Sequence, residues 1–466
     1  MEKFKRIWFL ALLAVLFLPM LQTLFHFVDE KPLDGAFDTA KKPVVTLKTL
    51  YHEGFVDSLT TKQSSTMTTQ DSLMTWCTEQ TGFRNSMIRV NNQLLYSAFG
   101  KIPVNSVVKG KDGTTLLEKS YINSYIGETY LGEERIQTIT QQIKLIQDML
   151  RTKGVTLLPV FVVGKASYYP ELIPDEYMAK RHETNNYKAY LEAFDKQQVE
   201  MIDFNRWFCE RKDTEEHPIY CNLSSHWTVY GASLAVDSLV TYMESKTHRT
   251  HVHPIIKAFD STYLMYQDDE LSRLMNLVFP LKHNTIDQPK FEYTSGYRPK
   301  VLTISDSYWW AVYSWDNALA LHQHLFADGG FWYYNKTIYP ERTPAQNIET
   351  INYKQEIEGQ EFVLLVCTER TNYFWPYDFI ERYLRSYDNV FRYKQPEQYD
   401  AADNLYVVYR NNRIESIIQN IKASPDWLES VKRNAEEKGL SMDQSLWECA
   451  EYTYLLTLEP KGFVIL

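Results

Sequence analysis

Two short segments of this chain carry a histidine and a serine of the kind that together transfer acyl groups. One reads Ser224-Ser-His-Trp-Thr228 and the other reads Ile304-Ser-Asp-Ser-Tyr308, so that His226 and Ser307 are 81 residues apart. A serine hydroxyl becomes a useful nucleophile at neutral pH when a histidine removes its proton and a third group holds the histidine's tautomer. The pair therefore predicts ester or acyl-transfer chemistry, with each segment expected just after a strand.

The elements that must position these segments alternate between strands and helices. Apolar runs predict strands at 155–163, 199–203, 301–304 and 362–367, and periodic apolar positions predict helices at 134–150, 184–198 and 229–243. Alternation of this kind is typical of an α/β domain with a mostly parallel sheet. Ligand sites in such sheets lie at the carboxyl ends of strands, where Gly164-Lys165, Ser305-Asp306-Ser307 and Thr368-Glu369 all fall.

Composition limits the class of protein. The 466 residues are 44 % hydrophobic, which is enough for a sizeable core. The formal net charge of −10 argues against a nucleic-acid partner, which needs a basic face. Aromatic residues make up 14 % of the chain; this suits stacking on sugar rings, but it also suits ordinary core packing.

The N-terminus predicts a membrane anchor. Three cations (Lys3, Lys5 and Arg6) precede an apolar run that extends from Ile7 to Val28. Its length is close to the roughly 20 residues that span a bilayer, and the charges favour an inside-to-outside orientation. No small-residue cleavage site follows, so we expect an uncleaved signal-anchor over residues 1–28, with a cleaved signal peptide as the alternative. Either reading places the remaining chain outside the cytoplasm.

The rest of the chain divides into three expected parts. Residues 29–75 are polar and are expected to form a stalk or periphery, 76–400 the α/β domain, and 401–466 a helical segment that packs on it. Cys209 and Cys221 bracket a polar loop, and in an oxidising compartment a disulfide between them would staple the loop that leads to His226. The cysteine spacing fits no metal motif, and we expect neither a metal nor a cofactor.

Several further segments make the chain resemble a known family. They are Gly82-Phe-Arg84, Phe99-Gly-Lys101, Val108-Lys-Gly-Lys-Asp-Gly113, Tyr121-Ile-Asn-Ser-Tyr-Ile-Gly127, Gly164-Lys-Ala-Ser-Tyr-Tyr-Pro-Glu171 and Phe331-Trp-Tyr-Tyr-Asn335. Together with the His226 and Ser307 segments, they resemble the SGNH-hydrolase-like family of the alginate O-acetyltransferases AlgJ and AlgX, also called DHHW proteins. The matching features extend from about residue 78 to 456.

The resemblance implies roles for individual residues. An Asp-x-His-Trp segment supplies acid and base in that family, and a Gly-Asp-Ser segment supplies the nucleophile, so His226 is the implied base and Ser307 the implied nucleophile. Asp306, Tyr334 and Lys165 are implied supporting residues. This chain departs from the pattern at Ser305, which replaces glycine, and at Ser224, which replaces the triad acid.

The change at position 224 matters most, because losing the orienting carboxylate of a serine-protease triad costs about 10⁴ in turnover. Another acid could take its place, and Asp213, Glu215, Glu216 and Asp306 are the candidates in the two segments.

Each candidate also has a purely structural reading. His226 next to Trp227 would be a buried, satisfied histidine, and Ser307 would be the N-cap of the following helix. Tyr334 lies in so aromatic a stretch that it would be core, and Lys165 would face solvent instead of an acidic sugar.

The resemblance implies an extracytoplasmic, inner-membrane-anchored enzyme that O-acetylates hydroxyls of a cell-surface or secreted polysaccharide through an acyl-serine. It also implies a membrane-bound O-acyltransferase of the MBOAT type as the acetyl-donating partner. Two alternatives remain open. One is a carbohydrate acetylesterase with the same Ser–His pair, and the other is a catalytically weak polysaccharide-binding scaffold, which Ser224 favours.

Overall fold

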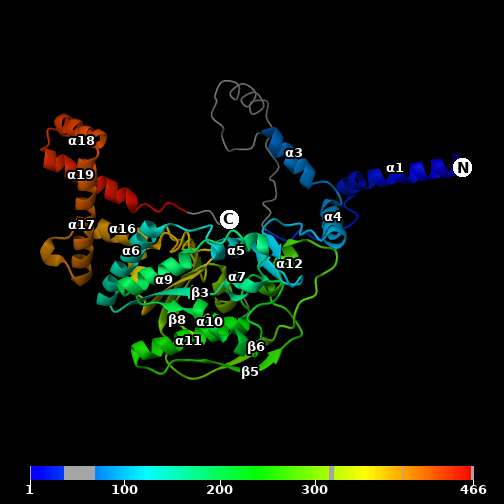
Figure 1. Ribbon diagram of the computed structural model, residues 1–466, viewed down its shortest axis with the longest axis horizontal. Coiled ribbons are helices and arrows are strands. Elements are labelled where there is room, and N and C mark those ends of the chain that lie inside the picture. The colour runs from blue at the N-terminus through cyan, green and yellow to red at the C-terminus, as the bar shows by residue number, and fades with distance from the viewer. Residues whose placement is uncertain (1, 36–68, 314–319, 392, 463–466) are drawn as a thin grey trace. The chain divides into compact units, whose positions relative to one another are not determined.

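The structure is a computed structural model that describes residues 2–35, 69–313, 320–391 and 393–462 (Figure 1). Contacts within the chain separate two units, one of residues 1–108 with 270–282 and the other of residues 109–269 with 283–466. His226, Ser307 and the other candidate site residues all belong to the second unit. Most of the expected stalk, residues 36–68, lies outside the described residues.

A six-stranded sheet forms the centre of the second unit, in the order β4-β3-β10-β7-β8-β9. All neighbours are parallel except β8 and β9, which are antiparallel. The strands are β1 (Val107–Lys109), β2 (Leu116–Glu118), β3 (Thr156–Val162), β4 (Ile202–Asp203), β5 (Pro254–Asp260), β6 (Gln288–Tyr293), β7 (Lys300–Ser305), β8 (Ala327–Tyr333), β9 (Thr337–Tyr339) and β10 (Phe362–Thr368). The predicted α/β fold with a mostly parallel sheet is confirmed.

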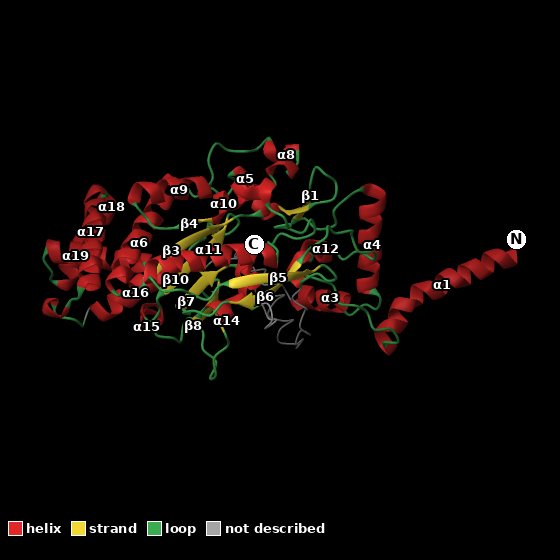
Figure 2. Cartoon of the chain, turned by 90° about the horizontal axis from the view of Figure 1, so that it is seen from below, coloured by secondary structure: helices red, strands yellow, loops and turns green. Residues whose placement is uncertain are grey.

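Helices pack around this sheet and extend beyond it (Figure 2). In the second unit the main helices are α5 (Lys119–Ile126), α6 (Glu133–Thr152), α7 (Lys165–Tyr168), α9 (Asn186–Gln197), α10 (Phe204–Arg211), α11 (Val229–Thr247), α13 (Trp310–Tyr313), α14 (Leu321–Leu325), α15 (Tyr353–Glu358), α16 (Phe379–Phe391), α17 (Ala401–Ala423), α18 (Pro425–Lys438) and α19 (Met442–Thr457). Helix α6 packs against β3, α9 and α17, which joins the sheet to the C-terminal helices.

The buried positions explain why the sequence patterns predicted these elements. In α6 the apolar residues Ile136, Ile139, Ile143, Ile146 and Leu150 recur at helical spacing, and all five are buried. Strand β3 is buried on both faces, as its continuous apolar run indicated, and β10 is buried at every residue. Pro159 is tolerated within β3 because β4 pairs only with Val160 and Phe161, so this part of the strand lies beyond that pairing.

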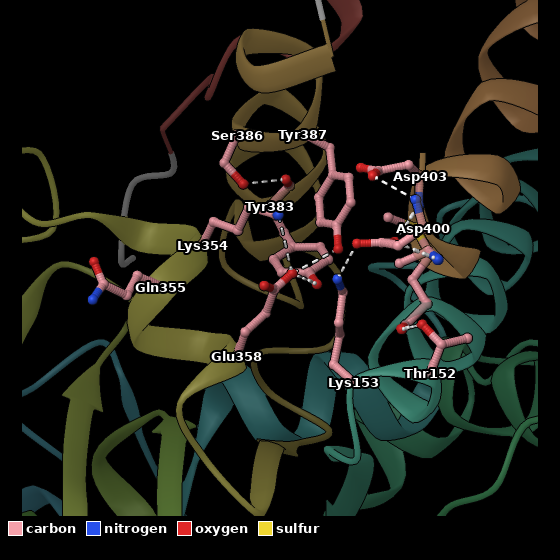
Figure 3. Close-up of polar contacts among 12 residues, drawn as sticks. Thr152, Lys153, Lys354, Gln355, Glu358, Tyr383, Ser386, Tyr387, Asp400 and Asp403 are labelled. Carbon is pink, nitrogen blue, oxygen red and sulfur yellow. Dashed lines mark hydrogen bonds and ion pairs between the residues drawn. The ribbon is translucent and has the colours of Figure 1, made fainter. Parts of the chain in front are cut away.

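Polar contacts fasten the C-terminal helices to the sheet unit (Figure 3). Lys153, just after α6, forms an ion pair with Asp400 at 2.5 Å, and Asp400 also caps α17 by accepting from the backbone N–H groups of Ala402 and Asp403. Glu358 of α15 accepts hydrogen bonds from the hydroxyls of Tyr383 (3.2 Å) and Tyr387 (2.6 Å) of α16. The predicted helical C-terminal segment is therefore present and packs on this unit.

The first unit contains the apolar N-terminal run as a helix. Helix α1 (Glu2–Phe25) contains an 18-residue window of mean hydropathy 2.2, and it is the one described helix that is long and apolar enough to cross a membrane. Helices α3 (Thr69–Glu79), α4 (Arg84–Phe99) and α12 (Glu270–Leu274) belong to the same unit. This finding is consistent with the expected anchor and equally with a signal peptide.

Candidate active site

The fold brings the predicted base and nucleophile into contact. The Nε2 atom of His226 lies 2.8 Å from the Oγ atom of Ser307, which is a hydrogen-bond distance. Both residues are half-buried, whereas Ser225, Trp227, Asp306 and Tyr308 beside them are buried. The pair is therefore open to a reactant on one side and supported by packed residues on the other. With Nε2 accepting from the hydroxyl, the histidine can remove the serine proton.

Ser307 is held at the carboxyl end of a central strand by Asp306. Strand β7 ends at Ser305, and the Asp306 side chain then caps a single 3₁₀ turn (Ser307–Trp309) by accepting from the backbone N–H of Tyr308 at 3.0 Å. Its other oxygen accepts from the hydroxyls of Thr368 (3.0 Å), the last residue of β10, and Thr371 (2.9 Å), three residues later. Asp306 thus fixes the nucleophile's turn to the neighbouring strand.

His226 lies in a loop, so the expectation that a strand directly precedes it was wrong. The nearest earlier strand, β4, ends at Asp203, and α10 and a 3₁₀ turn intervene. The loop is held instead by Lys165, whose buried ammonium group lies within hydrogen-bond distance of four backbone carbonyls that share its three N–H donors. These are the carbonyls of Leu116 (2.9 Å), Cys221 (2.8 Å), Asn222 (3.1 Å) and Ser224 (2.6 Å). Because Lys165 is only 1 % exposed, it supports the loop and does not face solvent.

The His226 loop and the Ser307 turn are joined directly. The indole N–H of Trp227 donates to the carbonyl of Tyr308 (3.0 Å), and the Tyr308 hydroxyl donates back to the carbonyl of Ser225 (2.5 Å). The Tyr308 ring also packs against the His226 ring, with centroids 5.1 Å apart. Burial raises the pKa of Tyr308 well above its usual value, so the phenol remains a hydrogen-bond donor.

Ser224, at the position of the family's acid, forms hydrogen bonds with backbone groups. Its hydroxyl lies 2.6 Å from the carbonyl oxygen of Gln267 and 2.9 Å from the backbone N–H of His226. The hydroxyl therefore ties the histidine's own backbone to a distant segment, 43 residues further along the chain.

The four acids considered from the sequence as replacements for the triad acid either have other hydrogen-bond partners or are exposed. Asp306 is occupied by the turn and the two threonines described above. Glu215 accepts from Arg211 (2.6 Å) and from the Tyr230 hydroxyl (3.1 Å), and Asp213 and Glu216 are exposed.

Tyr334 lies beside the nucleophile's strand. Its backbone N–H donates to the carbonyl of Ser305 at 2.8 Å, and its side chain is 2 % exposed among Tyr333, Phe374 and Tyr377. Burial and then the nearby Asp306 raise the pKa of its phenol. Tyr334 therefore packs in the aromatic core, as the alternative to a site role in the sequence analysis suggested.

Two charged residues near the site, Arg370 and Glu369, were given no role in the site by the sequence analysis. Arg370 follows β10 and forms an ion pair with Glu118 at 3.2 Å; burial lowers its pKa, but Glu118 and nearby anionic groups raise it overall. Glu369 is buried, and its burial raises the pKa of the carboxyl to about 7. A side chain at Gly164 would collide with Glu369 and Tyr121, which explains the glycine at this strand end. The strand-end position of Thr368-Glu369 was the one signal that pointed here.

The predicted disulfide is absent, because Cys209 and Cys221 are both free thiols. Cys209 projects from α10, and its Sγ lies 3.6 Å from the carbonyl oxygen of Ser167. Cys221 is fully buried under the His226 loop, with its Sγ 3.6 Å from the Asn222 side chain. The loop is stabilised by Lys165 where the sequence suggested a covalent staple.

A large cavity lies elsewhere in the second unit. It measures about 920 Å³ and is lined by α15 and α16, including Lys354, Gln355, Glu358 and Ser386, which Figure 3 shows. Neither His226 nor Ser307 lines it, so volume alone does not locate the reactive pair. Among the described residues, no group of three or more His, Cys, Asp or Glu side chains could hold a metal ion.

The geometry defines a Ser–His site at the carboxyl end of a parallel sheet, as in SGNH-type acyl-transfer enzymes. The sequence model of the family described as "ALGX: SGNH hydrolase-like domain, acetyltransferase AlgX" matches residues 109–275, a range that includes His226 and Lys165. The family resemblance inferred from the sequence is confirmed by this match.

Three solved structures are similar to the chain at low identity. The O-acetyltransferase domain of AlgJ from Pseudomonas putida shares 16 % identity at a TM-score of 0.41, over 65 % of this chain and 99 % of that one. AlgX from Pseudomonas aeruginosa shares 13 % at 0.38, over 59 % and 67 %. PatB1 from Bacillus cereus shares 12 % at 0.35, over 57 % and 96 %. No curated protein matches the sequence.

Proposed function

We propose that this protein is an O-acetyltransferase that acts on hydroxyls of a cell-surface or secreted polysaccharide. The observation that carries the proposal is the 2.8 Å contact between His226 Nε2 and Ser307 Oγ, made by a chain that matches the AlgX acetyltransferase model. The scaffold alternative, which Ser224 favoured, is weakened because the two reacting groups are in contact.

The reaction proceeds in two halves. His226 takes the Ser307 proton as Oγ bonds to the acetyl carbon of a donor, and the donor's leaving group departs with that proton. Acetyl-Ser307 then reacts with a sugar hydroxyl, whose proton passes to His226 as its oxygen bonds to the acetyl carbon. The bond to Ser307 breaks, and the proton returns to Oγ. Backbone N–H groups near Ser307 stabilise the oxyanion in both halves.

The location and partners follow from the same proposal. Helix α1 anchors the chain in the inner membrane, and the Ser–His unit lies outside the cytoplasm. A membrane O-acyltransferase of the MBOAT type delivers the acetyl group across the bilayer. The formal net charge of −10 argues against a nucleic-acid partner, which needs a basic face.

The test separates transfer from hydrolysis. The protein is incubated with an activated acetyl ester and a set of neutral and acidic oligosaccharides, and both released acetate and acetylated sugar are quantified. The proposal predicts acetylated sugar that depends on both His226 and Ser307. Acetate release with every sugar left unmodified would instead identify an acetylesterase. If neither product forms, the proposed function fails and the scaffold reading becomes the better one.

A further inference from the structure

The structure leaves one question about the catalytic pair, which is what orients the histidine when the family's acid is replaced by Ser224. A serine side chain is shorter than that of aspartate, and the Ser224 hydroxyl is engaged with the carbonyl of Gln267 at 2.6 Å. The chain at Gln267 therefore lies against position 224. The next residue along that chain is an acid, Asp268.

We propose that Asp268 is the positioning residue for His226, with its Oδ1 atom accepting from the imidazole Nδ1–H. This inference rests on the proposed function, because it assigns the third member of the same Ser–His site. The carboxylate would reach the imidazole from a different segment of the chain than in the Asp-x-His-Trp pattern.

Covalent geometry places Asp268 within reach. The carbonyl oxygen of one residue and the Cα of the next are separated by roughly 2.8 Å, so the Asp268 Cα lies within roughly 5.5 Å of the Ser224 hydroxyl. An aspartate carboxylate extends roughly 3.5 Å from its Cα. The group can therefore occupy the neighbourhood that the side chain of an aspartate at 224 would have filled.

Asp268 is also held as a positioning group must be. It is 1 % exposed, and its Oδ2 atom accepts from the side-chain amide of Gln288 (2.6 Å) and from the backbone N–H of Met265 (2.7 Å). Both donors are neutral, so they fix the carboxylate without neutralising its charge. A fixed, buried carboxylate near an imidazole stabilises the imidazolium that forms when the serine proton moves.

The first experiment follows the ring itself and needs no catalysis. Nitrogen-detected NMR of the parent protein, with the His226 signals assigned by their loss in His226→Gln, gives the tautomer and the pKa. The proposal predicts the Nδ1–H tautomer and a pKa above the ordinary value of about 6.5, because a carboxylate stabilises the protonated ring. A His226 pKa below the ordinary value, or the Nε2–H tautomer, would overturn it.

The second experiment compares matched isosteric variants. Asp268→Asn is expected to slow acylation of Ser307 about 10³-fold and to move the acid limb of its pH profile to lower pH by about one unit. Asp269→Asn, one residue away and half-buried, should stay within twofold of the parent with an unmoved profile. If Asp268 had only a structural role, Asp268→Asn would lower the thermal stability but leave the midpoint of the acid limb at the same pH as in the parent.

Lys165, Asp306 and Tyr308 hold the loop and turn of the pair, and Arg370 and Glu118 lie in the surroundings of Asp306 and Tyr121. These charged and titratable groups are identical in all variants. The assignment of Asp268 is wrong if Asp269→Asn or Glu270→Gln moves the midpoint of the acid limb of the acylation pH profile and Asp268→Asn does not. If Asp268→Asn fails to fold, the tautomer and pKa of His226, measured in the parent, decide whether a carboxylate accepts from the imidazole Nδ1–H. If no protein is acylated, the proposed function fails, but the NMR result still tests the contact.

Discussion

Trp227 and Tyr308 are joined by a hydrogen bond from the indole N–H to the backbone carbonyl, and each lies one residue beyond a member of the catalytic pair. This bond sets the two segments in register, so that His226 faces Ser307. A phenylalanine at 227 would keep an aromatic ring but leave the buried Tyr308 carbonyl without this donor.

We therefore expect Trp227→Phe to lower the free energy of unfolding by about 2 kcal/mol, the cost of an unsatisfied buried acceptor, and to slow Ser307 acylation. Urea denaturation and acylation rates with an activated ester measure the two effects. Trp447→Phe on α19, where the side chain is partly exposed, is the control and should change neither. Unchanged acylation in Trp227→Phe would show that the pair is aligned by other contacts.

Lys165 is expected to be essential for the His226 loop. Lys165→Met keeps the length of the side chain but removes the donors shared by four backbone carbonyls, three of them in buried contacts, so the free energy of unfolding should fall by about 3 kcal/mol or more. Lys246→Met, at an exposed surface ion pair, is the matched control and should cost less than about 1 kcal/mol. Parent-like stability in Lys165→Met would contradict the role assigned to the ammonium group.

Glu369 predicts a pH dependence of stability. Burial raises the pKa of its carboxyl to about 7 from 4.5 in the unfolded chain, so the folded state retains the proton over that interval. Because the folded state binds more protons there, stability falls as pH rises from about 4.5 to 7 and is constant above. The shift corresponds to a loss of about 3 kcal/mol.

Glu369→Gln removes this titration. Its melting temperature should rise relative to that of the parent as pH increases from about 4.5 to 7, and the difference should then level off. Calorimetry at several pH values makes the comparison. If the melting temperatures of the two proteins instead changed with pH in the same way across this range, Glu369 would be ionised in the folded state.

Much of the fold was accessible from sequence because its central strands are uniform apolar runs. The run Phe362–Cys367 reads as a strand buried on both faces, and it is β10. Strand β8 was missed because Gly329 and Gly330, both at positive φ, interrupt its pattern and resemble a turn. Periodicity records local burial, and it does not record such backbone conformations.

The site was predicted in part for the same reason. His226 and Ser307 are local motifs, whereas Lys165 acts on carbonyls up to 59 residues away, and the contact of Ser224 with Gln267 spans 43 residues. Contacts at such separations leave no trace in spacing. The disulfide was predicted from the separation of Cys209 and Cys221 along the chain, but their side chains have separate partners in the fold.

The central claim is that Ser307 is the nucleophile and His226 its base. The most direct measurement is intact-protein and peptide mass spectrometry after incubation with an activated acetyl ester. We predict one added acetyl group on the peptide that contains Ser307, its absence in Ser307→Ala, and labelling slowed by orders of magnitude in His226→Ala. Acetylation of another residue with Ser307 unmodified, or undiminished labelling in Ser307→Ala, would contradict the account.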